Sequence, residues 1–254
     1  MEKQTFKADD TIHVSGHPLD SLQLILEGTV SAAYDGGEIL LSKGDCLGLA
    51  GVFSNTHLMT VRAVTQVTVA SYAYDGEFMQ FLGKLPPEVK GYFASSISRQ
   101  IRELLSKYKM KKSDSMYSYN FYTHSYARYA KMCENHSMSP RTLPGQEDIA
   151  PLLIEEDIDP WLGGYYDCII ELLTNTPYPA RISLEFYCGL IMVMSRSISR
   201  LIILINLVHE YSQNIMRFFI NEEHLDFFEM FTAAYFRIYH LADKEKPDPA
   251  LIDD

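Results

Sequence analysis

Hydrophobic and polar positions alternate in short runs along the first part of the chain, and turn residues interrupt these runs. The runs that the pattern predicts as strands are 11–14, 22–26, 29–34, 38–41, 59–64 and 66–74. Short strands with a turn signal every eight to twelve residues or so are typical of an antiparallel barrel or sandwich. The Asp35-Gly36-Gly37 turn between two of the runs favours a hairpin there.

The periodicity becomes helical after about residue 75. Between 89 and 112, apolar residues recur at Phe93, Ile97, Ile101 and Leu104, the spacing of an amphipathic helix. Further on, the pattern predicts helices at 161–173 and 181–220, the latter with a break near Gly189, and a proline-containing loop with at most a short helix at 137–160. We therefore predict an α+β fold: an antiparallel, jelly-roll-like β-roll with flanking helices (1–112), an all-α domain (113–243) and a linker-like tail (244–254).

The longest apolar segment, 186–208, has Arg196 and Arg200 in its middle. Each arginine would cost about 3 kcal/mol at the centre of a bilayer, so we interpret the segment as buried helix and expect no membrane association. The N-terminus lacks an apolar signal-peptide core, and the four cysteines are too widely spaced for a zinc site. These features favour a cytoplasmic protein without a metal site.

The acidic excess of the chain lies entirely in its second part. Residues 1–112 contain 12 Lys and Arg and 12 Asp and Glu, whereas residues 113–254 contain 10 and 21. A negative field repels phosphate backbones, so the second part is a poor candidate for DNA binding. We expect no nucleic-acid partner.

Four short motifs occur in register within the predicted roll, and three of them contain the glycines Gly16, Gly28, Gly44 and Gly48. They read Ser15-Gly16, Leu24-Ile25-Leu26-Glu27-Gly28-Thr29-Val30, Gly44-Asp45-Cys46-Leu47-Gly48 and Thr60-Val61-Arg62-Ala63. Glycines of this kind mark tight corners, where φ is positive or another backbone comes close. Over about residues 6–112, the set resembles the cyclic-nucleotide-binding domain family, which includes catabolite activator protein and the regulatory subunit of protein kinase A.

The resemblance implies a phosphate-binding cassette between Gly48 and Arg62. In the family, a short helix, a glutamate and an arginine in this cassette hold the phosphate and the ribose hydroxyl. Here Leu49 stands at the position of the glutamate, and His57 is nearest to that of the arginine. We therefore expect altered or lost nucleotide specificity, with cAMP, cGMP or another small molecule as candidate ligands. The candidate ligand-binding residues are Gly48, Leu49, Ala50, His57, Leu58, Met59 and Thr60.

The sequence contains no GxSxG, HExxH, phosphate-loop or Rossmann motif, so we predict no catalytic residues and no enzyme activity. One hypothesis is a sensor in which the roll binds a ligand, the helix at 89–112 forms a homodimer and the helical domain relays the ligand state. The alternative is a ligand-free scaffold whose acidic, aromatic helical half docks another protein. The linker-like end favours a chain that is the N-terminal part of a larger signalling protein.

Overall fold

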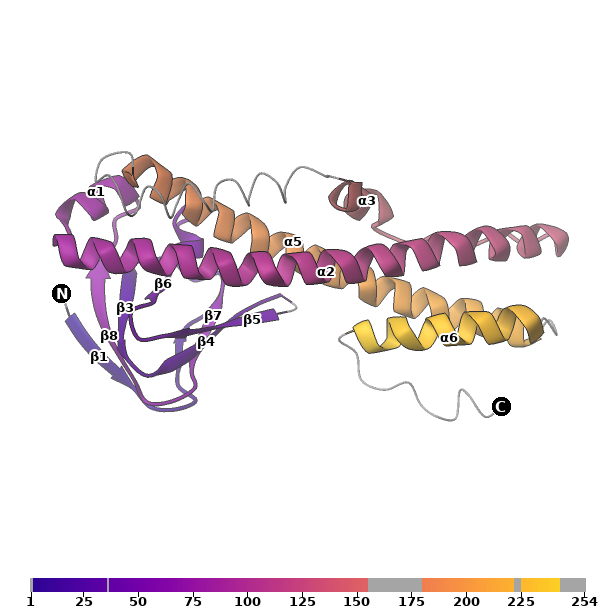
Figure 1. Ribbon diagram of the computed structural model, residues 1–254, viewed down its shortest axis with the longest axis horizontal. Coiled ribbons are helices and arrows are strands. Elements are labelled where there is room, and N and C mark those ends of the chain that lie inside the picture. The colour runs from indigo at the N-terminus through magenta and orange to yellow at the C-terminus, as the bar shows by residue number, and fades with distance from the viewer. Residues whose placement is uncertain (1, 36, 155–179, 222–224, 243–254) are drawn as a thin grey trace. The chain divides into compact units, whose positions relative to one another are not determined.

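The N-terminal part of the chain folds into two four-stranded antiparallel sheets (Figure 1). The computed structural model describes residues 2–35, 37–154, 180–221 and 225–242. One sheet has the order β1-β8-β3-β6 and the other β2-β7-β4-β5. The strands are β1 (Glu2–Phe6), β2 (Thr11–His13), β3 (Ser21–Glu27), β4 (Thr29–Tyr34), β5 (Gly37–Ser42), β6 (Cys46–Leu47), β7 (Thr60–Ala63) and β8 (Val67–Ala73). The predicted hairpin is present, since Tyr34 of β4 pairs with Gly37 of β5.

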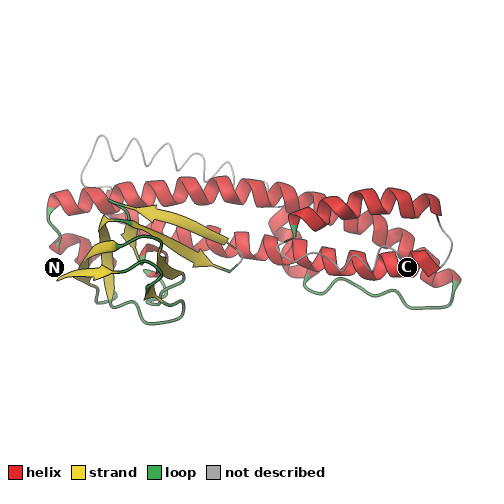
Figure 2. Ribbon diagram, turned by 90° about the horizontal axis from the view of Figure 1, so that it is seen from below, coloured by secondary structure: helices red, strands yellow, loops and turns green. Residues whose placement is uncertain are grey.

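Helices follow the sheets, as Figure 2 shows by colour. They are the 3-10 helix η1 (Leu49–Gly51), α1 (Phe78–Lys84), α2 (Pro87–Asn135), α3 (Gln146–Ile154), α5 (Ala180–Asn221) and α6 (Leu225–Leu241). This order of strands and then helices confirms the predicted α+β class. The predicted helix at 161–173 and the tail at 244–254 lie outside the described residues.

All four motif glycines adopt the left-handed conformation, with φ between 86° and 91°. Gly28 has a second constraint: a Cβ atom built on it would lie 2.2 Å from the backbone oxygen of Gln66. A side chain there would therefore clash with the neighbouring loop as well as strain the backbone. The prediction that these glycines form the corners of the roll is confirmed.

The helix predicted to end near Lys112 is longer than expected. It continues as α2 to Asn135, since no glycine or proline occurs between residues 92 and 135 to end it. Two serines at the predicted break donate back to the carbonyl of the preceding turn, Ser115 to Lys111 at 2.7 Å and Ser118 to Asp114 at 3.0 Å. Such bonds satisfy the hydroxyl groups without interrupting the helix. Gly189 likewise does not break α5.

The described residues form two compact units. The first contains residues up to Lys109 and α5 up to Ser199, and the second contains the remainder of α2, α3, α5 from Arg200 and α6. The first division lies close to the boundary expected at residue 112, but α5 contributes to both units. Whether residues 1–112 and 113–243 are the functional domains stays a prediction.

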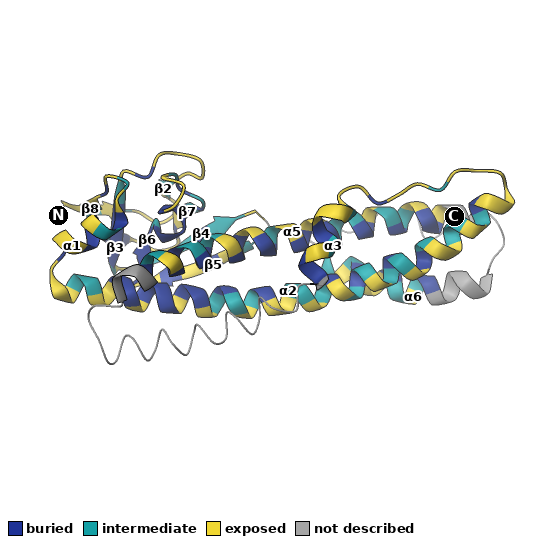
Figure 3. Cartoon of the chain, turned by 90° about the horizontal axis from the view of Figure 1, so that it is seen from above, coloured by how far each residue is buried: buried dark blue, intermediate teal, exposed yellow. Residues whose placement is uncertain are grey.

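The first unit buries the apolar stripe of α2 that was expected to form a dimer. Phe93, Ile97 and Leu104 have no exposed surface within a single chain, and buried positions recur along the helix with helical spacing (Figure 3). Other fully buried side chains of this unit are Leu22, Ile25, Ile39, Leu47 and Phe78. The stripe therefore gives no support to a dimer, and the homodimer stays a prediction.

One described helix is long and apolar enough to cross a membrane. In α5, this stretch runs from Leu184 to Arg217, and 61% of its most apolar window is buried inside the protein. A core helix of a water-soluble protein has the same properties, so length and composition alone do not assign a membrane span.

Candidate functional site

The candidate site begins where β6 passes into η1. Gly48 has φ 90° and immediately precedes Leu49, the first residue of η1. Two residues on, a Cβ atom at Gly51 would lie 2.1 Å from the backbone oxygen of Thr56, so only glycine allows the loop to fold back this closely. The residues from 48 to 57, which we call the cassette loop, thus form a compact turn.

A second loop holds the end of the cassette loop through the backbone. The N–H of His57 donates to the oxygen of His17 at 2.8 Å, and the N–H of Gly16 donates to the oxygen of His57 at 2.7 Å. The N–H of Leu19 donates to the oxygen of Asn55 at 2.9 Å. The backbone position of His57 is therefore fixed by residues some forty positions earlier in the sequence.

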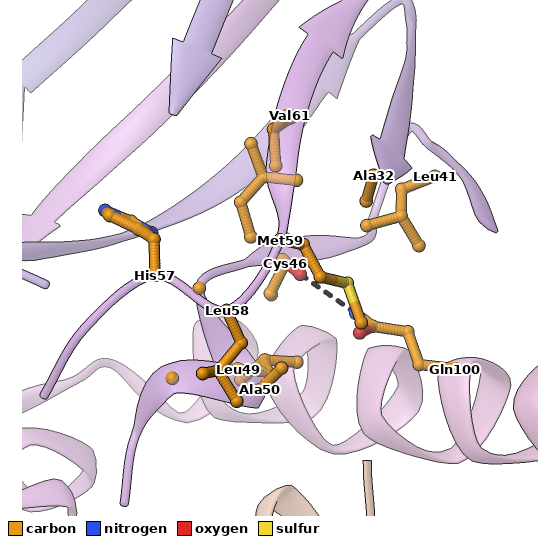
Figure 4. Close-up of a pocket in the computed structure, with 13 residues that line it drawn as sticks. Ala32, Leu41, Cys46, Leu49, Ala50, His57, Leu58, Met59, Val61 and Gln100 are labelled. Atoms are coloured by element: carbon orange, nitrogen blue, oxygen red, sulfur yellow. Dashed lines mark hydrogen bonds between the residues drawn. The ribbon is translucent and has the colours of Figure 1, made fainter. Parts of the chain in front are cut away.

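The cassette loop, the strands and α2 enclose a small, mainly apolar cavity (Figure 4). Its volume is about 20 Å³, which is room for about one water molecule. Leu49 and Met59, which line it, are 1% and 7% exposed. The cavity is therefore far smaller than a nucleotide.

Leu49 supplies no hydrogen-bond acceptor to this cavity. Its isobutyl side chain replaces a carboxylate at the place where the family resemblance implies a contact to the ribose hydroxyl. A hydroxyl group buried beside Leu49 without another partner would lose about 1–3 kcal/mol relative to its state in water.

His57 is a poor substitute for the arginine. Its side chain is 5% exposed, and its ring stacks on that of His13 with centroids 3.9 Å apart and planes at 20°. Burial lowers the pKa of His57 below its ordinary value of 6.5. In Figure 4 its ring points away from Met59 and Gln100. At neutral pH the histidine is therefore uncharged and offers a phosphate no ion pair.

His13 is uncharged for the same reason. Burial and the neighbouring His57 lower the pKa of His13 from 6.5 to about 4, against the opposing effect of Gln23. A nitrogen of the ring, Nε2, lies 3.0 Å from Oε1 of Gln23. The two stacked rings thus form a neutral pair beside the cassette loop.

Six of the seven candidate residues line the cavity. They are Gly48, Leu49, Ala50, His57, Leu58 and Met59. The seventh, Thr60, is not part of the lining; its hydroxyl oxygen accepts a hydrogen bond from the N–H of Ser15 at 3.2 Å. The proximity of the six is a fact of the fold, whereas contact of any of them with a ligand stays a prediction.

Gln100 of α2 also lines the cavity, although no pattern in the sequence points to it. Its Nε2 donates to the oxygen of Cys46 at 2.9 Å and to Oγ of Ser96 at 3.0 Å. Oγ of Ser96 in turn accepts from the N–H of Cys46 at 2.7 Å. All three residues are at most 4% exposed. No local motif marks Ser96 or Gln100, because their partner lies fifty residues earlier in the chain.

A salt bridge continues the contact between α2 and the strand ends. The guanidinium of Arg99 donates to Oδ1 of Asp45 from Nε at 2.9 Å and from Nη2 at 2.7 Å. Asp45 is buried, and its Oδ2 accepts from the N–H of Ser42 at 2.9 Å. We call Ser96, Arg99 and Gln100 the α2 latch. These residues are three and four positions apart and so lie on one face of the helix.

The cassette loop also touches α5. A Cβ atom built on Gly189 would lie 3.0 Å from Cε2 of Phe53, so the phenyl ring rests on the helix where it has no side chain. The oxygen of Val52 accepts a hydrogen bond of 3.3 Å from the hydroxyl of Tyr74.

Among the described residues, no group of three or more His, Cys, Asp and Glu side chains could hold a metal ion.

Comparisons with known proteins agree with the glycine pattern. Residues 3–83 match the family model of the cyclic nucleotide-binding domain, and no curated protein matches the chain. Among solved structures, the regulatory subunit of a cAMP-independent protein kinase A from Trypanosoma brucei is 29% identical over 32% of this chain and 31% of that one, with a TM-score of 0.29. A putative cyclic nucleotide-binding protein from Geobacter metallireducens is 20% identical over 32% and 62%, with a TM-score of 0.28. The matches thus span less than two thirds of either chain.

Proposed function

Because residues 3–83 are a cyclic nucleotide-binding domain, we propose that the protein is a non-enzymatic regulator that has lost ordinary recognition of cAMP and cGMP. The proposal rests on the identity of the side chains that line the cassette cavity. Leu49 and Met59 line it, and the ring of the neutral His57 stacks on His13. The site lacks both the carboxylate and the cation that hold a cyclic nucleotide in this family. Each charged hydrogen bond of that kind contributes about 1.5–3 kcal/mol.

We further propose that α2 and α5 transmit the state of the cassette loop to the helical unit. Gln100 of α2 contacts β6, and Gly189 of α5 contacts Phe53 of the loop. Both helices continue into the second compact unit. A displacement of the cassette loop would therefore change the packing of two helices, and both of these helices extend into the helical unit. The acidic helical half would then present this state to a protein partner.

A ligand-free scaffold is the second candidate function. The observation that favours it is the volume of about 20 Å³, which leaves no space for any ligand larger than water. Under this proposal the roll serves only to hold α2 and α5, and the helical half docks a protein without a signal from the cassette.

Thermal shift with cAMP and cGMP, with AMP as the acyclic control, tests the loss of nucleotide recognition. A nucleotide at a hundred times its Kd would stabilise the protein by about 2.7 kcal/mol. That is about 5–10 °C for a chain of this size. We expect no shift from any of the three at millimolar concentration. A shift of several degrees with cAMP or cGMP but not with AMP would overturn the proposal.

Hydrogen exchange separates relay from scaffold without a known ligand. In the variant Gln100→Met, which breaks the bond to Cys46, the relay proposal expects faster exchange of backbone amides both in the cassette loop and beyond Met110 in α2. The matched control is Ser95→Ala, at an exposed position on the same helix. Changes confined to the first unit would exclude the relay and favour the scaffold.

A further inference from the structure

The second compact unit contains a much larger cavity, which lies between α2 and α6. Its volume is about 430 Å³, within the range of about 300–1,000 Å³ that is usual for small-molecule sites. The cassette cavity, at about 20 Å³, is far smaller. Of these two cavities, only the one in the second unit has space for a small molecule.

One wall of this cavity, which we call the helical pocket, is aromatic. Tyr117 and Phe121 of α2 face Phe231 of α6, and the ring centroids of Phe121 and Phe231 are 5.1 Å apart. Phe231 is 2% exposed and belongs to the apolar core of the unit, together with Ile215. Packing against this core therefore holds Phe231 in place without a ligand.

Three other lining residues of α2 are polar or charged. Asn120, His124 and Arg128 also line the pocket, and their spacing of four residues places them in one row along α2. All three residues are exposed. Nδ1 of His124 lies 2.7 Å from the backbone oxygen of Asn120 and so must donate to it.

The one charged side chain in the described lining of the pocket is basic. The lining contains Arg128 and no aspartate or glutamate among the described residues, although the net charge of the protein is −11. A second arginine, Arg237, lies outside this lining, with its Cζ 4.0 Å from the centre of the Tyr117 ring. An arginine beside aromatic side chains is complementary to a molecule with an apolar body and an anionic group.

From this juxtaposition we propose that the helical pocket binds a small amphipathic anion. Its flat apolar part lies against Tyr117, Phe121 and Phe231, and its acidic group meets Arg128. The inference is independent of the cassette cavity, so it stands whether or not the roll recognises a nucleotide.

Titration of the full chain with two fluorescent probes tests the proposal. The probes are 8-anilinonaphthalene-1-sulfonate, which has an aromatic body and one negative charge, and the uncharged N-phenyl-1-naphthylamine. We expect saturable binding of the sulfonate at one site per chain and weaker binding of the neutral probe. An absence of saturable sulfonate binding would overturn the proposal.

Two pairs of variants locate the site. Arg128→Gln should weaken binding of the sulfonate about ten-fold, the effect of losing one exposed charged hydrogen bond, and leave the neutral probe unchanged. Lys131→Gln, which removes the same charge from α2 outside the pocket lining, should have no such effect. If both charge variants weaken binding equally, a pairing with Arg128 is excluded.

The second pair fills the cavity. Ala234 lines it, whereas the adjacent Ala233 is exposed and does not. Ala234→Trp should abolish binding of both probes, and Ala233→Trp should retain it, with circular dichroism to establish that each variant is folded. Binding that survives Ala234→Trp in a folded protein would place the probe elsewhere and refute the site.

Discussion

The contact between Ser96 and the N–H of Cys46 gives the sharpest test of how α2 is held on the roll. In Ser96→Ala the N–H loses its acceptor, and both residues have no exposed surface through which water could replace it. A buried donor without a partner costs about 1–3 kcal/mol. Gln100 keeps its bond to the oxygen of Cys46 but loses its second acceptor, Oγ of Ser96, so two buried donors lose a partner. We therefore expect destabilisation of at least about 2 kcal/mol.

The assay is thermal unfolding of the full chain, followed by circular dichroism. A loss of about 2 kcal/mol should lower the Tm by about 4–8 °C. The control is Ser95→Ala, which removes the same hydroxyl from the exposed neighbouring position and should change stability by less than about 0.5 kcal/mol. If the two alanine variants unfold at the same temperature, the Ser96 bond contributes nothing and the α2 latch is wrongly assigned.

Three further predictions concern single positions. Leu49→Ala should cost about 2–5 kcal/mol in chemical unfolding, because Leu49 is 1% exposed; a cost below that range would mean that the cavity collapses. Gly91→Ala should stabilise α2 by about 1 kcal/mol, since a Cβ atom there meets nothing within 4 Å; a lower Tm would contradict this. As the pH falls from about 6.5 to 4, the His57 and His13 pair should cost stability, because both have lowered pKa values and must take up protons that the unfolded chain binds readily. In Tm measurements across this range His57→Phe should reduce the loss, whereas His136→Gln, at an exposed histidine outside the roll, should not.

The elements that could be predicted from the sequence are those specified by local pattern. Gly28 and Gly48 mark corners because a left-handed backbone favours glycine at each position, and alternation specifies the strands between them. The continuation of α2 past Lys112 could not be predicted. Ser113, directly after two lysines, equally suggests a helix N-cap, and only the bond from Ser115 back to Lys111 shows that the helix continues.

The site shows the same division between local and distant information. The cassette residues Leu49 and His57 are found from neighbouring glycines in the sequence. Gln100 and Gly189 are not, because each reaches the cassette through tertiary packing over fifty to more than a hundred residues. The stacking of His57 on His13 likewise depends on a contact between two loops and strands far apart in the chain.

The corner glycines and the pocket chemistry are independent constraints. Gly48 and Gly51 are required by backbone geometry whatever the pocket contains, since a side chain at Gly51 would meet the oxygen of Thr56. Leu49 lies between them and is free of that constraint. A leucine that is 1% exposed stabilises the roll as core, which a glutamate in the same place could not do without a ligand or a cation. The corners of the roll therefore do not depend on which of these two side chains the cassette loop carries.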